Sequence, residues 1–257
     1  MTLTRWKITI EYNGGAFSGW QRQEHVPSVQ QCVEEAITGF CQQDITIHAA
    51  GRTDAGVHAY GQVAHFDLDY GDRPLSGFEL LKALNAHLRP HKISIVDAAP
   101  VDSEFHARFS ALNKLYIYRI LNRPAPPAIS QGEVWHAKRP LDAQKMHEAA
   151  QHLIGYHDFT TFRDSQCQAK SPMRTLDRIA IRREGDMIIL ETEARSFLHH
   201  QVRNMVGTLA LIGEGKWTRD DLEEAFAAKD RTRGGPTAPA EGLYLSRIDY
   251  ERELQIS

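Results

Sequence analysis

The sequence lacks the features that would place it in a membrane, outside the cell or around a thiolate metal site. No apolar run among its 257 residues approaches the roughly 20 residues needed to span a bilayer. The opening segment "MTLTRWKITIEY" has no apolar core of the kind found in a signal peptide. The three cysteines form no C-x-x-C pair, which argues against a disulfide framework and a thiolate zinc site. We therefore expect a cytoplasmic protein without membrane association.

The chain also lacks a large excess of charge of either sign. The formal net charge is -3 and the isoelectric point lies near 6.5, unlike a non-specific nucleic-acid binder. Basic residues nevertheless gather in two runs, 106–139 and 163–183, and the first contains Glu133 as its single acid. This segregation fits one phosphate-binding face. It fits equally well a chance distribution over solvated strands and loops.

The first hundred residues carry strand and helix patterns in alternation. In "WKITIEY" every second residue from Trp6 to Tyr12 is apolar, which is typical of a half-buried strand. Capping boxes at Ser28 and Ser76 predict two helix starts, with Gln31 and Glu79 as the reciprocal partners. The predicted elements are a strand over 6–12, a helix over 29–40, strands over 45–50 and 62–69, a helix over 77–88 and a strand over 92–99.

The same order returns in the second half, after the Pro-rich link "NRPAPPAIS". The predicted elements are a strand over 114–120, a helix from Asp142 to Gly155, a hairpin of 176–183 and 187–194, a helix from Leu198 to Gly213, a short helix over 219–228 and a final strand over 243–250. We therefore expect a mixed α/β (α+β) fold, in which two tandem RRM-like βαββαβ units form a continuous, mainly antiparallel sheet. The expected halves are 1–104, with the Asp54 loop, and 105–257, which completes an active-site cleft.

One carboxylate stands out in the connection between two predicted strands. Asp54 lies in "GRTDAG", two residues after Arg52 and between Gly51 and Gly56. The simplest interpretation is a turn residue that binds its own backbone. The alternative is a chemical role, because the glycines permit unusual backbone angles and Arg52 can hold a carboxylate ionised.

The segment "AAGRTDAGVHAYGQVAHF" closely resembles the catalytic motif of the tRNA pseudouridine synthase A family. Six further segments resemble family blocks in family order, so the resemblance covers essentially the whole chain: "GWQRQ" at 19–23, "FHARFSA" at 105–111, "YIY" at 116–118, "FRDSQCQ" at 162–168, "FLHHQVRNMVGTL" at 197–209 and "APAEGLYL" at 238–245. Where the family more usually has a tyrosine and a histidine, this chain has His199 and His200. Around Tyr116 it has Leu115 and Ile117 in place of the usual basic residues.

The resemblance implies an isomerase that turns uridine into pseudouridine at positions 38–40 of the tRNA anticodon stem-loop. The uracil stays in the pocket between cleavage and rejoining, so this intramolecular transfer needs neither a metal nor another cofactor. Asp54 is the implied nucleophile, and it attacks the sugar, attacks carbon 6 of the base, or acts through a glycal. The implied partners are tRNA and a second copy of the chain in a homodimer.

The resemblance also assigns substrate-binding residues. Tyr116 matches the tyrosine that stacks on the target base, and its phenol is a candidate for the final proton removal. Arg203 lies on a largely apolar helix and should meet a carboxylate, which the resemblance identifies as Asp54. Leu243 matches a pocket wall. Positions that touch RNA or open the target site are matched by Arg52, Phe105, His106 and Arg108.

Three other interpretations follow from the residues. A metal site would use His58 with His65 or His199 with His200, but neither pair has the helical spacing of a zinc motif. An RNA-binding module without chemistry would display paired RNP aromatics, and no segment fits that consensus. A nucleosidase would need a second acid or a water-activating base near Asp54, and none is apparent in the sequence.

Overall fold

The computed structural model describes residues 3–71 and 74–251. Within them the chain packs as two compact units. The first contains the residues up to Leu112 and those from Leu245 onward, and the second is Asn113–Tyr244. Helices accompany mainly antiparallel strands in both units, which confirms the predicted mixed α/β class. The expected division into an RRM-like half 1–104 and an RRM-like half 105–257 stays a prediction.

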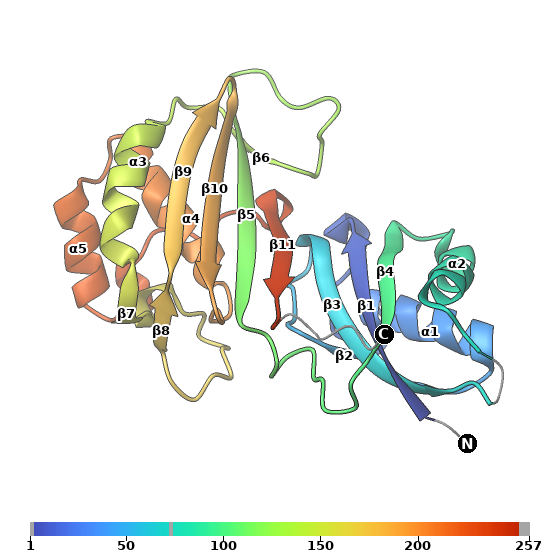
Figure 1. Ribbon diagram of the computed structural model, residues 1–257. Helices are drawn as coiled ribbons and strands as arrows, with labels where there is room; N and C mark the ends of the chain where they lie inside the picture. Colours follow the sequence, from blue (N-terminus) through green and yellow to red (C-terminus); the bar gives the residue numbers. More distant parts are fainter. Residues whose placement is uncertain (1–2, 72–73, 252–257) are drawn as a thin grey trace. The chain divides into compact units, whose positions relative to one another are not determined.

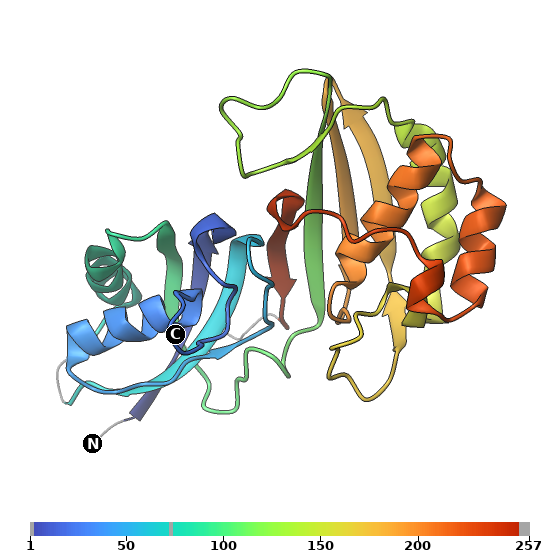
Figure 2. The same ribbon diagram turned by 180° about the vertical axis from the view of Figure 1, so that it is seen from behind.

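The first unit has the predicted βαββαβ order (Figure 1). Its elements are β1 (Leu3–Tyr12), η1 (Gly14–Ala16), α1 (Val29–Cys41), β2 (His48–Ala49), β3 (His58–Asp69), α2 (Gly77–Leu88) and β4 (Ile93–Val101). Its strands lie in the order β4, β1, β3 and β11 (Leu243–Asp249), with β2 also paired to β3. Helices α1 and α2 lie on one face of this sheet (Figures 1 and 2).

Alternation along β1 builds the core of this unit. Trp6, Ile8 and Ile10 are each at most 2% exposed. In the antiparallel register Trp6 lies opposite Phe66, and Ile8 lies opposite Ala64. Burial of each large apolar side chain contributes about 1.5–3 kcal/mol, so the pattern "WKITIEY" fixes which face of the strand meets the helices.

The two predicted capping boxes differ in outcome. At α2 the box is complete, since Ser76 accepts the backbone N–H of Glu79 and the Glu79 carboxylate accepts the N–H of Ser76. At α1 Ser28 accepts the N–H of Gln31, but the Gln31 side chain donates to Glu35 instead. The predicted hydrogen bond from the Ser28 N–H to the Gln31 side chain was therefore wrong, because Glu35, four residues further along the helix, competes for the Gln31 side chain.

The second unit builds its own sheet from β5, β10 and β9, in that order. Helices α3, α4 and α5 lie on one face of it (Figure 2). Its elements are β5 (Asn113–Asn122), β6 (Trp135–Ala137), α3 (Ala143–Ala150), η2 (Gln151–Leu153), β7 (Gly155–Asp158), η3 (Thr160–Phe162), β8 (Met173–Leu176), β9 (Arg178–Glu184), β10 (Met187–Ala194), α4 (Gln201–Gly213), α5 (Arg219–Ala227), η4 (Arg231–Arg233) and η5 (Ala240–Gly242).

Some predicted bounds need correction. The strand expected over 45–50 is only His48–Ala49, because the N–H of Ile47 donates to the Glu34 carboxylate rather than to a neighbouring strand. The helix expected from Leu198 begins at Gln201, since His200 has a left-handed backbone with φ 60°. Leu198 is buried just ahead of the helix. The short strands β6, β7 and β8 were not predicted.

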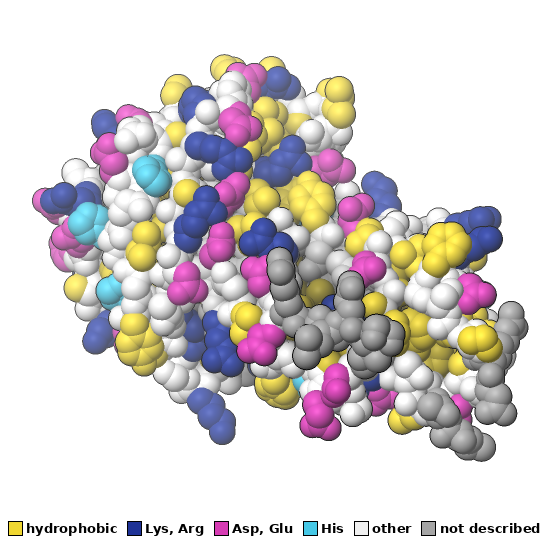
Figure 3. Space-filling view, viewed as in Figure 1, with side chains coloured by type: hydrophobic (Ala, Val, Ile, Leu, Met, Phe, Trp, Pro, Cys, Tyr) yellow, Lys and Arg dark blue, Asp and Glu magenta, His cyan; other side chains and the backbone are white. Residues whose placement is uncertain are grey.

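The open face of the second sheet carries paired charges. Arg178 bridges Glu191 and Glu193, and Arg182 bridges Glu184 and Glu191, at 2.7–3.1 Å. Dark blue and magenta side chains accordingly lie intermixed over β9 and β10 in Figure 3. These two arginines of the second basic run are therefore neutralised by neighbours and do not form a phosphate-binding face.

Among the residues described, no helix combines the length and the apolar character needed to cross a membrane.

Candidate active site

Asp54 lies in the loop between β2 and β3, which turns tightly at its end. The N–H of Val57 donates to the backbone carbonyl of Asp54 at 3.1 Å, and Gly56 has φ 79°, a left-handed value that glycine adopts without strain. In an Asx turn the N–H of Gly56 would donate to the Asp54 carboxylate. It donates instead to the carbonyl of Phe17, at 3.4 Å. The turn is thus closed by backbone carbonyls, which weakens the interpretation of Asp54 as a simple turn former.

Residues next to Asp54 are held from behind by a buried layer. The N–H of Trp20 donates to the carbonyl of Thr53 at 3.0 Å, and the hydroxyls of Tyr12 and Thr53 lie 2.8 Å apart. Gly19 has φ 97°, and a Cβ there would lie 2.7 Å from the Thr53 carbonyl oxygen, so only glycine allows this approach. The segment "GWQRQ" therefore serves as a rigid support for the loop, and such support is what a preorganised reactive group requires.

A buried carboxylate ties this support to α1. Glu34 accepts hydrogen bonds from Arg22 Nη1 at 3.0 Å, from Gln30 Nε2 at 2.8 Å and from the N–H of Ile47 at 3.2 Å. The Gln30 side-chain oxygen accepts the N–H of Arg22 in turn. One acid thus joins the segments on both sides of α1, and the sequence pattern gave no signal for it.

Arg52 is exposed. Its expected support of the carboxylate stays a prediction. An exposed guanidinium in this loop remains suitable for a phosphate of a bound nucleic acid.

The predicted RNA-contacting residues Phe105, His106 and Arg108 lie on one loop after β4. Phe105 is only 8% exposed and packs against Tyr250 at a ring distance of 5.1 Å, so it supports the loop from within. Arg108 is exposed. The aromatic side chain that this loop displays is Phe109, which is 70% exposed and lies 4.3 Å from the His106 ring. Sequence patterns missed Phe109 because a loop has no periodicity that separates inward from outward residues.

Backbone hydrogen bonds fix the ring tautomers of two histidines under this loop. The N–H of Ala107 donates to His65 Nδ1 at 3.2 Å, and the N–H of Arg108 donates to His106 Nδ1 at 3.1 Å. A nitrogen that accepts such a bond carries no proton, so both rings are neutral with the proton on Nε2. A metal ligated through Nε2 would require the opposite tautomer. The structure therefore argues against a metal on either ring.

Burial and crowding agree with these neutral forms. The pKa of His65 is lowered to about 4, mainly by burial and then by the nearby His106, His48 and Arg5, while Asp67 raises it. Burial also lowers the pKa of His106, together with the charges of His48 and Arg5. The three rings border a hollow of about 410 Å³ beside the Arg5–Asp67 ion pair.

Three predicted residues lie in the second unit. Tyr116 on β5 shares a strand face with the buried Tyr118, and its ring meets Phe197 edge-on at 5.2 Å. Arg203, in the first turn of α4, donates through Nε to the carbonyl of Ala238 at 2.8 Å. Leu243, the first residue of β11, is 5% exposed. Its predicted role as a pocket wall stays a prediction, since burial also fits a core residue.

Asp164 and His200, to which no catalytic or RNA-binding role was assigned, meet at the start of α4. Asp164 Oδ2 lies 2.7 Å from His200 Nδ1, and Asp164 Oδ1 lies 3.6 Å from His199 Nδ1. Although burial raises the pKa of Asp164, the N–H of Gln166 and the His200 ring lower it more, so it stays below its usual value. Asp164 and His200 are 36 positions apart, and the segments that contain them, 162–168 and 197–209, do not predict that the two side chains meet.

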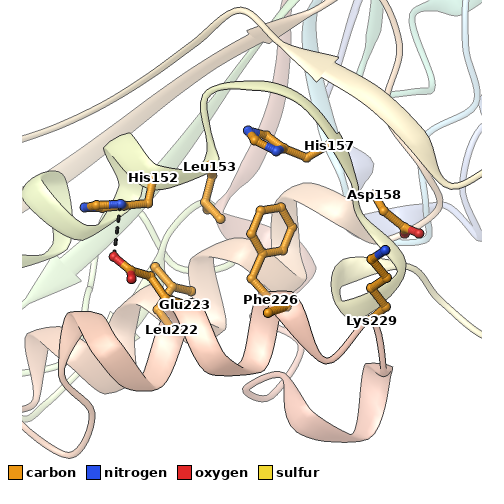
Figure 4. Close-up of a pocket in the computed structure, with 9 residues that line it drawn as sticks. His152, Leu153, His157, Asp158, Leu222, Glu223, Phe226 and Lys229 are labelled. Atoms are coloured by element: carbon orange, nitrogen blue, oxygen red, sulfur yellow. Dashed lines mark ion pairs between the residues drawn. The ribbon is translucent and has the colours of Figure 1, made fainter.

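A further hollow of about 260 Å³ lies where α5 approaches η2 and β7 (Figure 4). Its floor is apolar, with Leu153, Leu222 and Phe226, and the ion pair of His152 and Glu223, at 3.1 Å, stands at its edge. No predicted site residue lines it. Within each unit the structure brings together the Asp54 loop with its support, the 105–109 loop with its histidines, and the start of α4 with Tyr116 through Phe197.

Comparison with known proteins identifies the class. The family model described as tRNA pseudouridine synthase matches residues 8–110 and 149–251. The tRNA pseudouridine synthase A of Rhodospirillum centenum (strain ATCC 51521 / SW) is 54% identical over 248 residues, which cover 96% of this chain and 100% of the relative. That of Parvibaculum lavamentivorans is 54% identical over 97% of this chain and 100% of its own. The tRNA pseudouridine synthase A of Caulobacter vibrioides is 54% identical to this chain, and the match covers 96% of this chain and 99% of the relative.

The chain therefore belongs to the tRNA pseudouridine synthase family, a family of isomerases.

Proposed function

We propose that this chain isomerises uridine to pseudouridine at positions 38–40 of the tRNA anticodon stem-loop, with Asp54 as the nucleophile. The observation that carries the proposal is the construction of the Asp54 loop. Its turn is closed by backbone carbonyls, and Trp20, Tyr12 and Gly19 hold Thr53 in place. Rigid support for one acid is what a reaction with a single nucleophile requires.

The reaction explains why one acid suffices. A glycosidase needs a second group to protonate a leaving group that departs. In this isomerisation the uracil turns within its pocket and rejoins the ribose through carbon 5, where it loses one proton while nitrogen 1 gains one. No redox or metal chemistry is called for by that balance.

The other predicted residues receive roles in the same proposal. Tyr116 stacks on the target uracil, Arg203 pairs with the Asp54 carboxylate, and Leu243 closes the pocket. On the RNA side, Arg52 and Arg108 bind phosphates or open the target site. Phe105 and His106 hold the Arg108 loop in shape, in agreement with their packing. A flipped nucleotide loses a few kcal/mol of stacking, which these contacts must offset.

We further propose that the protein works in the cytoplasm and that two copies share one tRNA. Analytical ultracentrifugation at working concentration tests the second point. A sedimentation coefficient of a monomer alone, with and without tRNA, would contradict it.

The central test is tritium release from tRNA labelled at carbon 5 of uridine, in chelated buffer, for the parent and Asp54→Asn. We expect release by the parent and background release by the variant, with tRNA binding retained. Asp97→Asn removes an exposed acid of the same unit and should behave as the parent. A folded parent that binds tRNA without release would instead favour an RNA-binding module, and release by Asp54→Asn would refute the assignment of the nucleophile.

A further inference from the structure

Arg5 lies at the point where the chain leaves the first sheet for the 105–109 loop. In the antiparallel register of β1, Arg5 is opposite Asp67 on β3 and opposite Val101, the last residue of β4. Arg5 Nε and Nη2 donate to the two carboxylate oxygens of Asp67, at 2.7 and 2.8 Å. These two parallel bonds hold the guanidinium group in one orientation.

The third nitrogen of this guanidinium group holds the start of the loop. Arg5 Nη1 donates to the backbone carbonyls of Ser103 and Phe105, the second at 3.0 Å. Arg5 therefore makes four hydrogen bonds, two to β3 and two to the segment that follows β4. Backbone carbonyls of a loop need partners outside a strand ladder, so a side chain that binds two of them fixes the path of the chain.

The middle of the loop is attached to the same sheet through Ala107. Its N–H donates to His65 Nδ1 at 3.2 Å, and its carbonyl accepts the hydroxyl of Tyr250 at 2.6 Å. Next along the chain come Arg108 and Phe109, which are both exposed, with the Arg108 guanidinium 5.9 Å from the centre of the Phe109 ring. The loop thus has a fixed base on the sheet and an exposed tip that is cationic and aromatic.

The ion pair of Arg5 and Asp67 is placed to hold this base rather than to bind RNA itself. The two side chains are 22% and 34% exposed, and hydrogen bonds from Arg5 lower the pKa of the Asp67 carboxyl below its usual value. A phosphate that approached Arg5 would also meet this ionised carboxylate, which disfavours a direct contact. Surface ion pairs in general add little to stability, so the bonds to the loop are the distinctive feature of this one.

We propose that Arg5, held by Asp67, is a positioning residue that keeps the 105–109 loop in the conformation that binds tRNA. This inference rests on the proposed function, in which Arg108 binds a phosphate or opens the target site. A loop that is ordered before binding loses less conformational entropy than a loop that the RNA must order. The pair therefore acts on the affinity for tRNA and not on the chemical step.

The first test is tRNA binding and steady-state kinetics of Arg5→Lys. Lysine keeps the positive charge but has three N–H groups on one nitrogen, so it cannot make all four hydrogen bonds. Because Arg108 and Phe109 must then be ordered by the RNA, we expect the affinity for tRNA to fall by about 10-fold and KM to rise by a similar factor, with little change in kcat. If Arg5 instead bound RNA through its charge, lysine would retain most of the affinity.

Asp67→Asn gives a sharper test, because charge alone and the proposed role predict opposite signs. Removal of an acid from a protein that binds a polyanion strengthens the binding if only charge matters. In our proposal an amide, with one oxygen and no charge, holds Arg5 less firmly than the carboxylate does. The affinity for tRNA should therefore fall, by roughly 3-fold or more.

A background without the loop tip separates positioning from a merely structural role. In Arg108→Ala/Phe109→Ala the loop has no exposed cation or ring left to position. Addition of Arg5→Lys to this background should weaken tRNA binding by less than about 2-fold, since the two changes then act on one interaction. A general loss of stability would weaken binding equally in both backgrounds.

The matched control is Arg182→Lys. Arg182 also bridges carboxylates on an open sheet face, but both partners, Glu184 and Glu191, lie on strands. Its replacement should leave the affinity for tRNA and KM as in the parent.

All variants are first shown to be folded by circular dichroism. The inference is overturned if Asp67→Asn binds tRNA as tightly as the parent or more tightly, or if Arg5→Lys costs the same affinity with and without the loop tip. A parent that binds tRNA but releases no tritium from carbon 5 of uridine would instead refute the proposed function.

Discussion

Acid should destabilise the first unit through one histidine. His65 is 3% exposed, and its Nδ1 accepts the N–H of Ala107, so the folded state holds the ring neutral. Its pKa lies at about 4, against 6.5 for an ordinary histidine. When the pKa of a group is lower in the folded state, a falling pH protonates the group in the unfolded chain before it does so in the folded protein, and this favours unfolding. The stability that the neutral ring contributes is therefore complete above pH 6.5 and is lost as the pH falls toward 4.

The magnitude follows from the two pKa values. The difference of about 2.5 between the two pKa values corresponds to a loss of about 3 kcal/mol of unfolding free energy once His65 is protonated in both states. Between pH 7.5 and pH 5.0 the loss is about 2 kcal/mol by the same relation. For a domain of marginal stability this is a large fraction of the total.

The assay is urea unfolding at both pH values, read by the fluorescence of Trp6 and Trp20. Trp135 and Trp217 are replaced by Phe in every protein, so that the signal reports on the first unit. His65→Asn retains an acceptor for the Ala107 N–H and cannot titrate. The fall in unfolding free energy from pH 7.5 to 5.0 should be about 2 kcal/mol smaller in His65→Asn than in the parent.

The control is His91→Asn, which removes an exposed histidine of the same unit and should leave the pH dependence as in the parent. Equal losses in the parent and His65→Asn would refute the reasoning. So would a parent that is more stable at pH 5.0, since the sign follows directly from the lower pKa of the folded state.

Three further predictions concern the loops around Asp54 and the 105–109 segment. Gly19→Ala should lower kcat by 10-fold or more with a small change in KM for tRNA, because the new Cβ would meet the Thr53 carbonyl. The control for backbone strain alone is Gly71→Ala, since Gly71 also has a positive φ but has open space around it, and equal effects of the two changes would contradict the reasoning. Tyr12→Phe should cost about 1 kcal/mol in urea unfolding through the lost bond to Thr53, and an unchanged midpoint would show that the hydroxyl contributes nothing. Phe109→Ala should weaken tRNA binding by about 10-fold in filter binding, since a stacked base is worth about 1–3 kcal/mol. Phe78→Ala removes a phenylalanine on α2 that is 73% exposed and should leave tRNA binding unchanged, so equal losses of affinity in the two variants would argue against stacking.

Much of the fold was accessible from the sequence because its signals are periodic. Alternation along residues 6–12 predicted β1, and the Ser76–Glu79 box predicted the start of α2 within one residue. The signal fails where a single side chain redirects the backbone. Glu34 takes the N–H of Ile47 and shortens the expected strand, and the left-handed His200 delays α4 by three residues.

The site was accessible only in part, for a related reason. A motif marks the residues that carry chemistry, such as Asp54, but not those that hold them. The support from Tyr12 and Gly19 depends on tertiary contacts between segments more than 30 residues apart. The same is true of the Asp164–His200 pair. On the 105–109 loop the motif contains two phenylalanines, and only packing shows that Phe105 is internal and Phe109 is displayed.

The construction of the Asp54 loop bears on why an acid stands there. If Asp54 served the turn, its carboxylate would accept the N–H of Gly56, and its removal would cost about 1 kcal/mol of stability. That N–H goes to Phe17, and the N–H of Val57 goes to the Asp54 backbone carbonyl, which any residue would supply. The turn therefore does not require an aspartate, whereas Gly19 and Gly56 are required by the path of the chain. A side chain that the local fold does not need, placed on a loop that the surrounding fold keeps rigid, is best explained by its chemistry.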